Sequence, residues 1–234
     1  VDEHGKTVPA AGQAGKTGFL YIVNRLTGKL IRKSEAIVEQ GPNFMKPPTT
    51  TPQTYWPANK GGAMWSPPAY SPQTKFFYTM GMNEAHDYVL NKPLPEVFKP
   101  GTPIRGQYSG GDMALNTKVF APNGTFTALD TTTGKIAWQY KSKRPMYGGA
   151  LATASGLVFA GDMDGDFIAF DAKTGKEIWR YPMGAGVCTP PITYRIKGVQ
   201  YIAVGAGGCH GGEVLMHDEG RPLFGDVFAI FALP

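Results

Sequence analysis

Carboxylates alternate along one short segment of this sequence, which runs Asp162-Met-Asp-Gly-Asp166. Asp side chains are preferred ligands of Ca²⁺, so this spacing raises the question of a cation site. The segment lacks the order of a 12-residue calcium loop and its closing Glu, and it falls at an expected turn between two strands. We therefore interpret the three carboxylates as turn residues and predict no metal ligand on this chain.

A second polar group, Glu84, His86 and Asp87, clusters in an expected loop. These residues could line a substrate entrance, but we favour a plain surface loop. His210 has no partner at ligand spacing, and we interpret it as structural. The sequence has no Cys-x-x-Cys-His haem site and no phosphate-binding glycine loop, which argues against a fused cytochrome and a nucleotide cofactor.

Two cysteines, Cys188 and Cys209, flank a predicted β-hairpin at 191–204, whose turn is Lys197-Gly198. Pairing outward from that turn brings residue 188 close to residue 207, so the two sulfurs could meet at the end of the ladder. A disulfide would fit an exported protein. Two unpaired buried thiols are the alternative, and both remain open.

The composition restricts the fold that must position these groups. The 234 residues include 31 Gly and 20 Pro, and only 18% are charged. This excludes a helical bundle, because long amphipathic helices need many charged residues and few helix breakers. No apolar run of 18 or more residues exists, so no membrane-spanning helix is expected. Many short strands joined by tight turns are predicted instead.

The net charge of +5 is scattered along the chain. Its densest basic cluster, Lys141, Lys143 and Arg144, is better explained as a solvated face than as a nucleic-acid site. No nucleic-acid partner is therefore predicted. A basic surface could still help to dock an acidic protein.

An internal repeat is the strongest signal in the sequence. Residues 124–140 align without gaps on residues 165–181, with 9 of 17 positions identical at an offset of 41 residues. A weaker third copy spans 18–32, where Arg32 replaces the tryptophan. A period near 40 residues, made of strand-like segments, matches one four-stranded blade of a β-propeller. We therefore predict an all-β chain built of propeller blades.

Each repeat is expected to form a β-hairpin. Its turn combines an Asp that caps backbone amides with a Gly that accepts a positive φ. Trp138 and Trp179 follow in the second strand, and we interpret them as packing anchors between neighbouring blades rather than as cofactor contacts. Two further stretches, 33–60 and 91–111, are expected to be long loops.

With these repeats in place, the chain resembles the C-terminal part of the dehydrogenases that depend on pyrroloquinoline quinone (PQQ), a family of eight-bladed propellers. The pattern Ala-x-Asp-x-x-Thr-Gly-Lys-x-x-Trp, at 128–138 and 169–179, resembles that family's tryptophan-docking motif. Other segments that resemble the family are 15–29, 61–72, 145–161 and the closing Phe-Ala-Leu-Pro. The resemblance implies that residues 1–234 supply about four of the eight blades. Another chain, or a missing N-terminal half, would complete the ring.

The resemblance also implies cofactor-binding residues. Lys16 stands where the family places a basic side chain against the quinone oxygens, and it would there stabilise negative charge on the reduced quinone. A solvated charge is its other interpretation. Trp65 and Tyr147 are candidates to line the pocket, with core packing as the alternative. Gly148 and Gly149 would let the backbone approach a flat ligand closely.

Two departures from the family leave the polar contacts to the quinone, and the substrate subclass, open. Met64 stands where many members have Asn, and Tyr147 stands where Trp is common. The Ca²⁺ or lanthanide ligands and the catalytic base are implied to lie on the missing part, so no catalytic residue is assigned here. The chain begins at Val1 without an initiator Met or an apolar signal region, and we expect that it was processed or cut from a longer protein.

The implied activity is oxidation of an alcohol, sugar or polyol by hydride transfer to PQQ. The implied partners are a companion chain with the N-terminal blades and a cytochrome c or quinone that accepts the electrons. The implied location is the periplasm. The alternative is a non-catalytic propeller that serves as a scaffold for envelope protein assembly. A scaffold would keep the repeats, but it would not need Lys16 or the Gly-Gly-x-x-Trp segment.

Overall fold

The computed structural model describes residues 2–3, 5–91, 114–208 and 225–232. Within these ranges the chain is all-β and forms antiparallel sheets without a helix. No helix of the described part is therefore long and apolar enough to cross a membrane. Most of the expected loop at 91–111 lies outside the described residues, as do Cys209 and His210.

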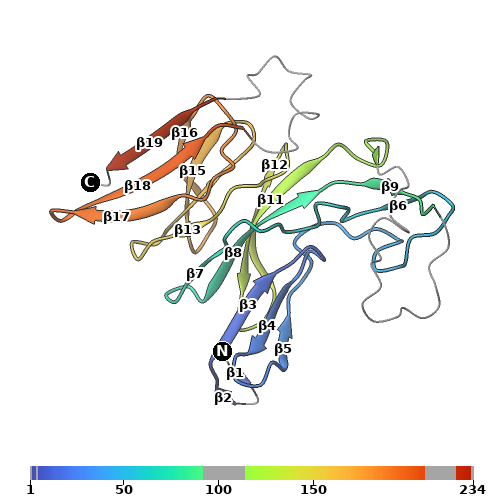
Figure 1. Ribbon diagram of the computed structural model, residues 1–234. Coiled ribbons are helices and arrows are strands. Elements are labelled where there is room, and N and C mark those ends of the chain that lie inside the picture. Colours follow the sequence, from blue (N-terminus) through green and yellow to red (C-terminus); the bar gives the residue numbers. More distant parts are fainter. Residues whose placement is uncertain (1, 4, 92–113, 209–224, 233–234) are drawn as a thin grey trace, which may run out of the picture.

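Two four-stranded sheets form the middle of the molecule (Figure 1). Each is a meander of consecutive antiparallel strands, apart from one longer excursion of the chain between β8 and β11. The first contains β7 (Ala69–Ser71), β8 (Phe76–Asn83), β11 (Asn123–Asp130) and β12 (Ile136–Ser142). The second contains β13 (Leu151–Ala152), β14 (Leu157–Gly161), β15 (Asp166–Asp171) and β16 (Glu177–Pro182).

A three-stranded sheet stands on each side of this pair (Figure 1). One contains β3 (Ala10–Ala14), β4 (Leu20–Asn24) and β5 (Leu30–Lys33), and the other contains β17 (Ile192–Ile196), β18 (Val199–Ala206) and β19 (Val227–Ala232). The four sheets follow one another in chain order, as propeller blades do. The structure is thus a partial propeller of about four blades, as predicted.

Two small sheets lie outside this series. One is the hairpin of β1 (Asp2–Glu3) and β2 (Lys6–Thr7). The other contains β10 (Ala114–Leu115), β9 (His86–Tyr88) and β6 (Gln53–Tyr55). The expected loop at 33–60 is therefore irregular for most of its length but includes one strand, β6. The loop cannot be recognised as part of a sheet from its own residues, because the partner strand β9 is 33 positions away at the Thr54–Asp87 pair.

The two strong repeats form the predicted hairpins in the same register. Ala128 pairs with Trp138, and Ala169 pairs with Trp179. Both ladders shift register immediately after that alanine, and the hairpin of the weaker copy shifts between Ile22 and Val23. The repeat thus encodes a bulged hairpin and not only a hydrophobic pattern.

Three apolar cores lie between successive sheets. Alternate residues of each strand face the preceding or following sheet, so both faces of the middle sheets are buried. Each core contains side chains from two successive sheets. In chain order, examples are Leu20 with Leu129, Phe126 with Phe170, and Phe167 with Ile202. This packing explains why β14 and the interior of β15 are continuously apolar.

The repeat tryptophans join neighbouring sheets, as predicted. The Trp138 indole Nε1 donates to the carbonyl of Ala172 in the next sheet at 3.0 Å, and its ring lies 6.0 Å from that of Phe170. Trp179 lies with its ring 5.0 Å from that of Phe231 in β19. Both side chains are therefore packing anchors of the fold.

The C-terminal hairpin also has the predicted register. Ile192 pairs with Ala203, and Ile196 pairs with Val199 across the Lys197-Gly198 turn. The Gly208 amide continues this alignment by donating to the Gly186 carbonyl at 3.1 Å. Cys188 is disulfide-bonded.

Candidate functional site

Loops from all four principal sheets meet around one cavity of about 380 Å³. The loop between β3 and β4 contributes Lys16, and the segments that precede β7, β13 and β17 contribute most of the rest. The lining residues are Lys16, Asn59, Lys60, Met64, Trp65, Tyr147, Cys188, Thr189 and Gly208. Three residues predicted to bind a cofactor, Lys16, Trp65 and Tyr147, are therefore brought together although they are far apart in sequence.

Lys16 is held in place by the Gly61-Gly62 pair. The Lys16 ammonium donates to the Asn59 carbonyl at 2.8 Å, and the Gly62 amide donates to the Lys16 carbonyl at 2.8 Å. Gly61 has φ +80°, and a Cβ at this position would lie 2.5 Å from the Cβ of Lys16. Only glycine fits this contact, which explains the glycine pair of the Gly-Gly-x-x-Trp segment.

Trp65 and Tyr147 form contrasting parts of the wall. The Trp65 side chain is 72% exposed, whereas Tyr147 is 5% exposed and packs with Met82 and Met163 beneath the cavity. The Ser66 hydroxyl donates to the Tyr147 carbonyl and ties the two loops together. The alternative role of core packing therefore applies in part to Tyr147, which is buried, but not to Trp65, which is exposed.

Gly148 and Gly149 are buried and are not among the residues that line the cavity. A Cβ at Gly149 would lie 2.5 Å from the Cβ of Pro190, and one at Gly148 would lie 3.0 Å from the Val187 carbonyl oxygen. In this structure the two glycines allow close packing between loops. A direct role at the cofactor stays a prediction.

An ion pair joins the cavity wall to a buried carboxylate behind it. Lys60 Nζ lies 3.1 Å from Glu84 Oε1, and the other oxygen of Glu84 lies 3.4 Å from Nε2 of His86. Glu84 is 2% exposed and His86 is 7% exposed. The favoured interpretation as a surface loop was therefore wrong for Glu84 and His86, which are buried, whereas Asp87 in β9 is only partly buried. No sequence motif marks Lys60.

The pKa values follow from this geometry. Burial raises the pKa of Glu84, but His86 and Lys60 together lower it more, so it lies below its ordinary value. Burial lowers the pKa of Lys60, but Tyr147 and Glu84 raise it above its ordinary value. The pKa of Tyr147 is raised by burial despite the nearby Lys60 ammonium. The group is thus a charged Glu84–Lys60 pair beside a neutral phenol.

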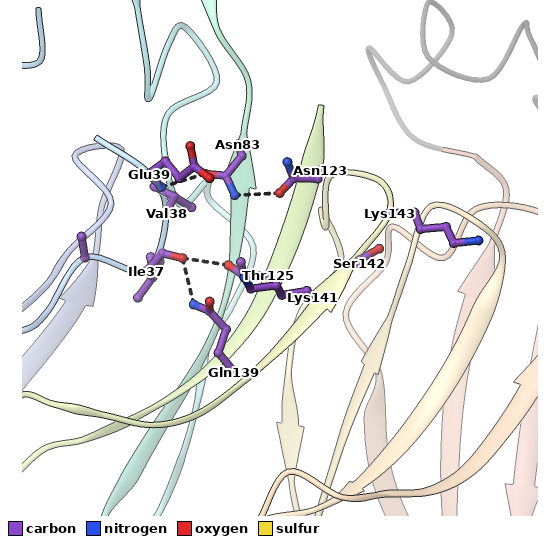
Figure 2. A pocket seen from close by; sticks show the side chains of 11 residues that line it. Ile37, Val38, Glu39, Asn83, Asn123, Thr125, Gln139, Lys141, Ser142 and Lys143 are labelled. Carbon is purple, nitrogen blue, oxygen red and sulfur yellow. Dashed lines mark hydrogen bonds between the residues drawn. The ribbon is translucent and has the colours of Figure 1, made fainter. Parts of the chain in front are cut away.

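A second cavity, of about 520 Å³, lies beside the 36–39 segment (Figure 2). Its amide and hydroxyl groups bind one another or the backbone. Asn83 donates to Asn123 at 2.8 Å, and Thr125 and Gln139 both donate to the Ile37 carbonyl, at 3.0 and 3.1 Å. The bonds to Ile37 hold the segment that follows β5 against β11 and β12, so we interpret the polar groups of this cavity as structural.

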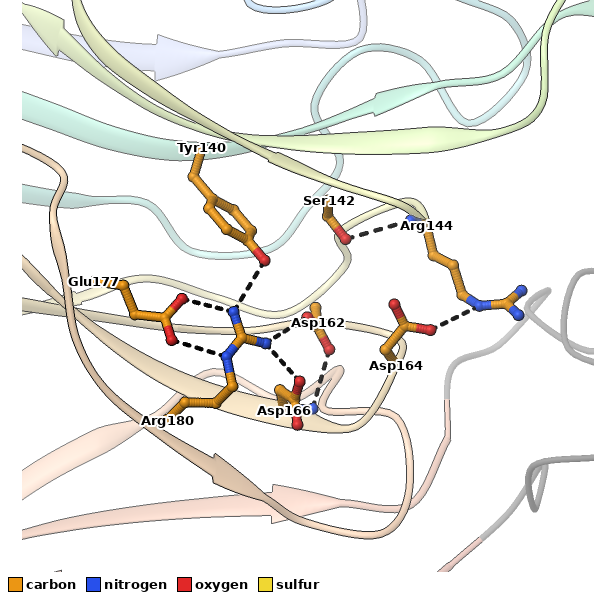
Figure 3. Close-up of polar contacts among 8 residues, drawn as sticks. All are labelled: Tyr140, Ser142, Arg144, Asp162, Asp164, Asp166, Glu177 and Arg180. Carbon is orange, nitrogen blue, oxygen red and sulfur yellow. Dashed lines mark hydrogen bonds and ion pairs between the residues drawn. The ribbon is translucent and has the colours of Figure 1, made fainter. Parts of the chain in front are cut away.

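All three alternating carboxylates have partners, and Asp162 and Asp166 share Arg180 (Figure 3). Asp164 accepts from Arg144 Nε at 2.9 Å, and Asp166 pairs with Arg180. Asp162 is buried and accepts from the Asp166 amide at 3.0 Å. Across the described ranges, no three His, Cys, Asp or Glu side chains are grouped to hold a metal ion. The three carboxylates therefore stabilise the turn, through a backbone hydrogen bond and ion pairs with Arg144 and Arg180.

The 380 Å³ cavity has the chemistry of a site for a flat anionic ligand. Two ammonium groups, Lys16 and Lys60, line it together with an exposed indole, and the described lining residues include no carboxylate. The buried hydroxyl of Tyr147 has no hydrogen-bond partner in the described part of the chain. A buried hydroxyl without a partner is unfavourable, so a ligand oxygen would stabilise it. PQQ, a planar quinone with carboxylates, fits this set of groups.

Comparisons with known proteins identify the family. Residues 31–202 match the PQQ family described as "Glucose/ethanol/alcohol dehydrogenase, beta-propeller domain". Quinoprotein alcohol dehydrogenase PedE of Pseudomonas putida is 35% identical over the whole of this chain and 38% of its own length. The quinoprotein ethanol dehydrogenase of Pseudomonas aeruginosa is 34% identical over 98% of this chain and 40% of its own length.

Solved structures agree with these relatives. A europium-containing methanol dehydrogenase matches 98% of this chain and 46% of its own at a TM-score of 0.75 and 27% identity. The quinohemoprotein alcohol dehydrogenase of Comamonas testosteroni matches 88% of this chain and 33% of its own at a TM-score of 0.73 and 29% identity. The chain spans about two fifths of the length of the curated relatives that it matches first. It belongs to the β-propeller family of PQQ-dependent glucose, ethanol and alcohol dehydrogenases.

Proposed function

We propose that this chain is one part of a PQQ-dependent alcohol dehydrogenase and that its 380 Å³ cavity forms one wall of the cofactor site. The observation that carries the proposal is the convergence of Lys16, Trp65 and Tyr147 from three separate loops on that cavity. The identities of 30–35% to several quinoprotein alcohol dehydrogenases support the same assignment. The remaining blades would come from a companion chain or from a longer form of this protein.

PQQ, when bound, supplies a two-electron acceptor that takes a hydride from the alcohol carbon. The role of this chain is to bind and polarise. The ammonium of Lys16, fixed by the Asn59 carbonyl, would face the ligand oxygens and stabilise negative charge as it develops. Trp65 would cover the flat face of the ligand and exclude water from it.

Alcohols are the proposed substrates in preference to sugars or polyols, because the relatives named above are alcohol dehydrogenases. The proposed electron acceptor is a cytochrome c. A 1-butanol dehydrogenase of Thauera butanivorans that is 32% identical over 85% of this chain carries cytochrome c in its name. Ca²⁺ or a lanthanide would be bound by residues of the remaining blades, which this chain does not supply.

The proposed location is the periplasm. The observation that supports it is the disulfide bond of Cys188, because disulfides persist in oxidising compartments. Fractionation of the source cells, followed by detection of the protein in the periplasmic and cytoplasmic fractions, tests this proposal. Recovery in the cytoplasmic fraction alone would contradict it.

The activity is tested on the complete propeller protein, loaded with PQQ and either Ca²⁺ or a lanthanide, by dye-linked oxidation of primary alcohols. We expect alcohol-dependent dye reduction, and we expect Lys16→Ala to lower kcat by about 100-fold or more, as removal of one charge-stabilising donor does. Lys16→Arg should keep much of the rate. A protein that takes up no PQQ, or a Lys16→Ala variant with an unchanged rate, would refute the proposal.

A further inference from the structure

The Glu84–Lys60 pair is asymmetric with respect to the cavity. The side chain of Glu84 is 2% exposed, whereas that of Lys60 is 21% exposed and lines the cavity. The Glu84 carboxylate is therefore buried away from the cavity, whereas the Lys60 ammonium faces it. A pair oriented in this way presents positive charge to the cavity although it is neutral as a unit.

A purely structural role does not account for this arrangement. Burial of an ion pair contributes little net stability, and apolar side chains of similar volume often serve as well. A buried carboxylate is nevertheless costly unless it is paired, so Glu84 holds the Lys60 ammonium close to it. Glu84 thus restricts the position of a long and otherwise flexible side chain, which is what a binding group requires.

The same short segment positions both cations of the cavity. The Asn59 carbonyl accepts from the Lys16 ammonium, Lys60 is the next residue, and Gly61 packs against Lys16. The Lys60 ammonium also lies 5.4 Å from the ring centroid of Tyr147, whose buried hydroxyl has no hydrogen-bond partner in the described residues. A ligand oxygen on this side would meet the Lys60 ammonium and the Tyr147 hydroxyl.

We propose that Lys60, held by Glu84, is a second cofactor-binding cation, and that it binds an anionic oxygen such as a PQQ carboxylate on the Tyr147 side of the cavity. The inference rests on the proposed function for the identity of the ligand. Lys60 is then a binding residue, and Glu84 is a positioning residue that acts through it. Neither is carried by a sequence motif.

The test measures the dissociation constant of PQQ for the complete apo-protein by quenching of tryptophan fluorescence. The informative variant is the double substitution Lys60→Met with Glu84→Gln, because it removes the cation without leaving a buried carboxylate unpaired. We expect binding about 10- to 100-fold weaker than wild type, the effect of losing one hydrogen bond to a charged group. The affinity should also depend less on salt concentration.

Two further variants separate binding from folding. Lys60→Arg, with Glu84 intact, should restore affinity to within about threefold, because it keeps both the charge and a donor. Lys176→Met removes an exposed lysine on another turn and should leave the affinity unchanged. Circular dichroism and thermal unfolding of each apo-variant establish that the propeller is intact before titration.

The outcomes distinguish the two proposals. If the wild-type protein binds no PQQ, the proposed function fails. If it binds PQQ and oxidises alcohols, but the folded double variant binds with unchanged affinity and salt dependence, the function stands and the role of Lys60 is refuted. A loss of affinity that Lys60→Arg restores supports the role.

Discussion

Arg32 occupies in the weak repeat the place that Trp138 occupies in the first strong one. Its Nη1 donates to the Thr131 carbonyl at 2.7 Å, as the Trp138 indole donates to the Ala172 carbonyl at 3.0 Å, and the two acceptors are one 41-residue repeat apart. A Cβ on Gly134 would meet the Arg32 side chain, and one on Gly175 would meet the Trp138 ring. The Arg32 guanidinium therefore joins two sheets through the same contacts as the Trp138 indole: a hydrogen bond to a backbone carbonyl and packing against a glycine of the same turn.

This equivalence predicts how the two anchors respond to substitution. Arg32→Ala should lower the free energy of unfolding by about 1–2 kcal/mol, through the lost charge-assisted hydrogen bond. Trp138→Ala should lower it by about 2–4 kcal/mol, because a large, partly buried ring is removed. Arg32→Trp should stay within about 1 kcal/mol of wild type, because the equivalent turn of the next sheet already packs against an indole, that of Trp138. Urea denaturation measures all three.

Arg25→Ala is the control for this series. Arg25 is exposed, and its substitution should change the free energy of unfolding by less than about 0.5 kcal/mol. If Arg32→Ala changed the free energy of unfolding as little as Arg25→Ala does, Arg32 would not be a packing anchor equivalent to Trp138.

Gly61→Ala should disturb the cavity through Lys16. Its added Cβ would lie 2.5 Å from the Lys16 Cβ and 2.6 Å from the Lys16 Cα, so the backbone of Lys16 must shift. We expect PQQ binding at least about 10-fold weaker, because a displaced charge loses most of a charge-assisted contact. Fluorescence titration of the complete apo-protein provides the measurement.

Gly28→Ala is matched to Gly61→Ala in backbone conformation. Gly28 has φ +71°, and a Cβ there would meet nothing within 4 Å. It should incur the same backbone strain, about 1 kcal/mol, without changing the PQQ affinity. Equal affinities for the two variants would show that Gly61 does not seat Lys16.

Asp162 should make stability depend on pH. Burial, with the neighbouring Asp166 and Asp164 charges, raises its pKa to about 6, although the Asp166 amide and Arg180 oppose the shift. Because the pKa in the folded protein lies above the ordinary value of 3.8, the native state binds more protons between about pH 4 and 6. The Asp162 contribution to stability is therefore lost as pH rises through this window.

The substitution Asp162→Asn isolates that contribution. The difference in free energy of unfolding between variant and wild type should shift in favour of the variant by about 2–3 kcal/mol from pH 4 to pH 7. Urea denaturation at half-unit pH steps gives the two profiles. Parallel profiles across this range would contradict a raised pKa at Asp162.

Reduction of the disulfide should weaken both the fold and the cavity. Cys188 is disulfide-bonded and lines the cavity, so its release frees part of the wall. Dithiothreitol should lower the free energy of unfolding by about 2–5 kcal/mol and weaken PQQ binding. The Cys188→Ser variant should show the same deficit without reductant and no further response to it. Thermal unfolding with and without dithiothreitol measures the effect.

Much of the fold could be predicted from the sequence because its determinants are local. The Asp, Gly and Trp of each repeat lie within one hairpin, and the turn at Lys197-Gly198 sets the register of its own two strands. The 41-residue offset is enough to identify repeated blades and, with the Gly-Gly-x-x-Trp segment, the family. Lys16, Trp65 and Tyr147 could be proposed as site residues through that resemblance.

The interpretation of Glu84 and His86 failed because burial is not a local property. Their segment is short and polar, and nothing in it shows that both side chains are buried or that the following strand, β9, pairs with β6 and β10. Lys60 was missed for the same reason, since its partner Glu84 is 24 positions away.

The order of residues thus specified the blades, their hairpins and the family, since turn chemistry and side-chain alternation act over a few residues. The packing of separate sheets determined the cavity, the hydrogen bond from Arg32 to the neighbouring sheet, and the pairing of Lys60 with Glu84. The Lys60–Glu84 and Arg32–Thr131 contacts join residues 24 and 99 positions apart, and their distances depend on how whole sheets stack.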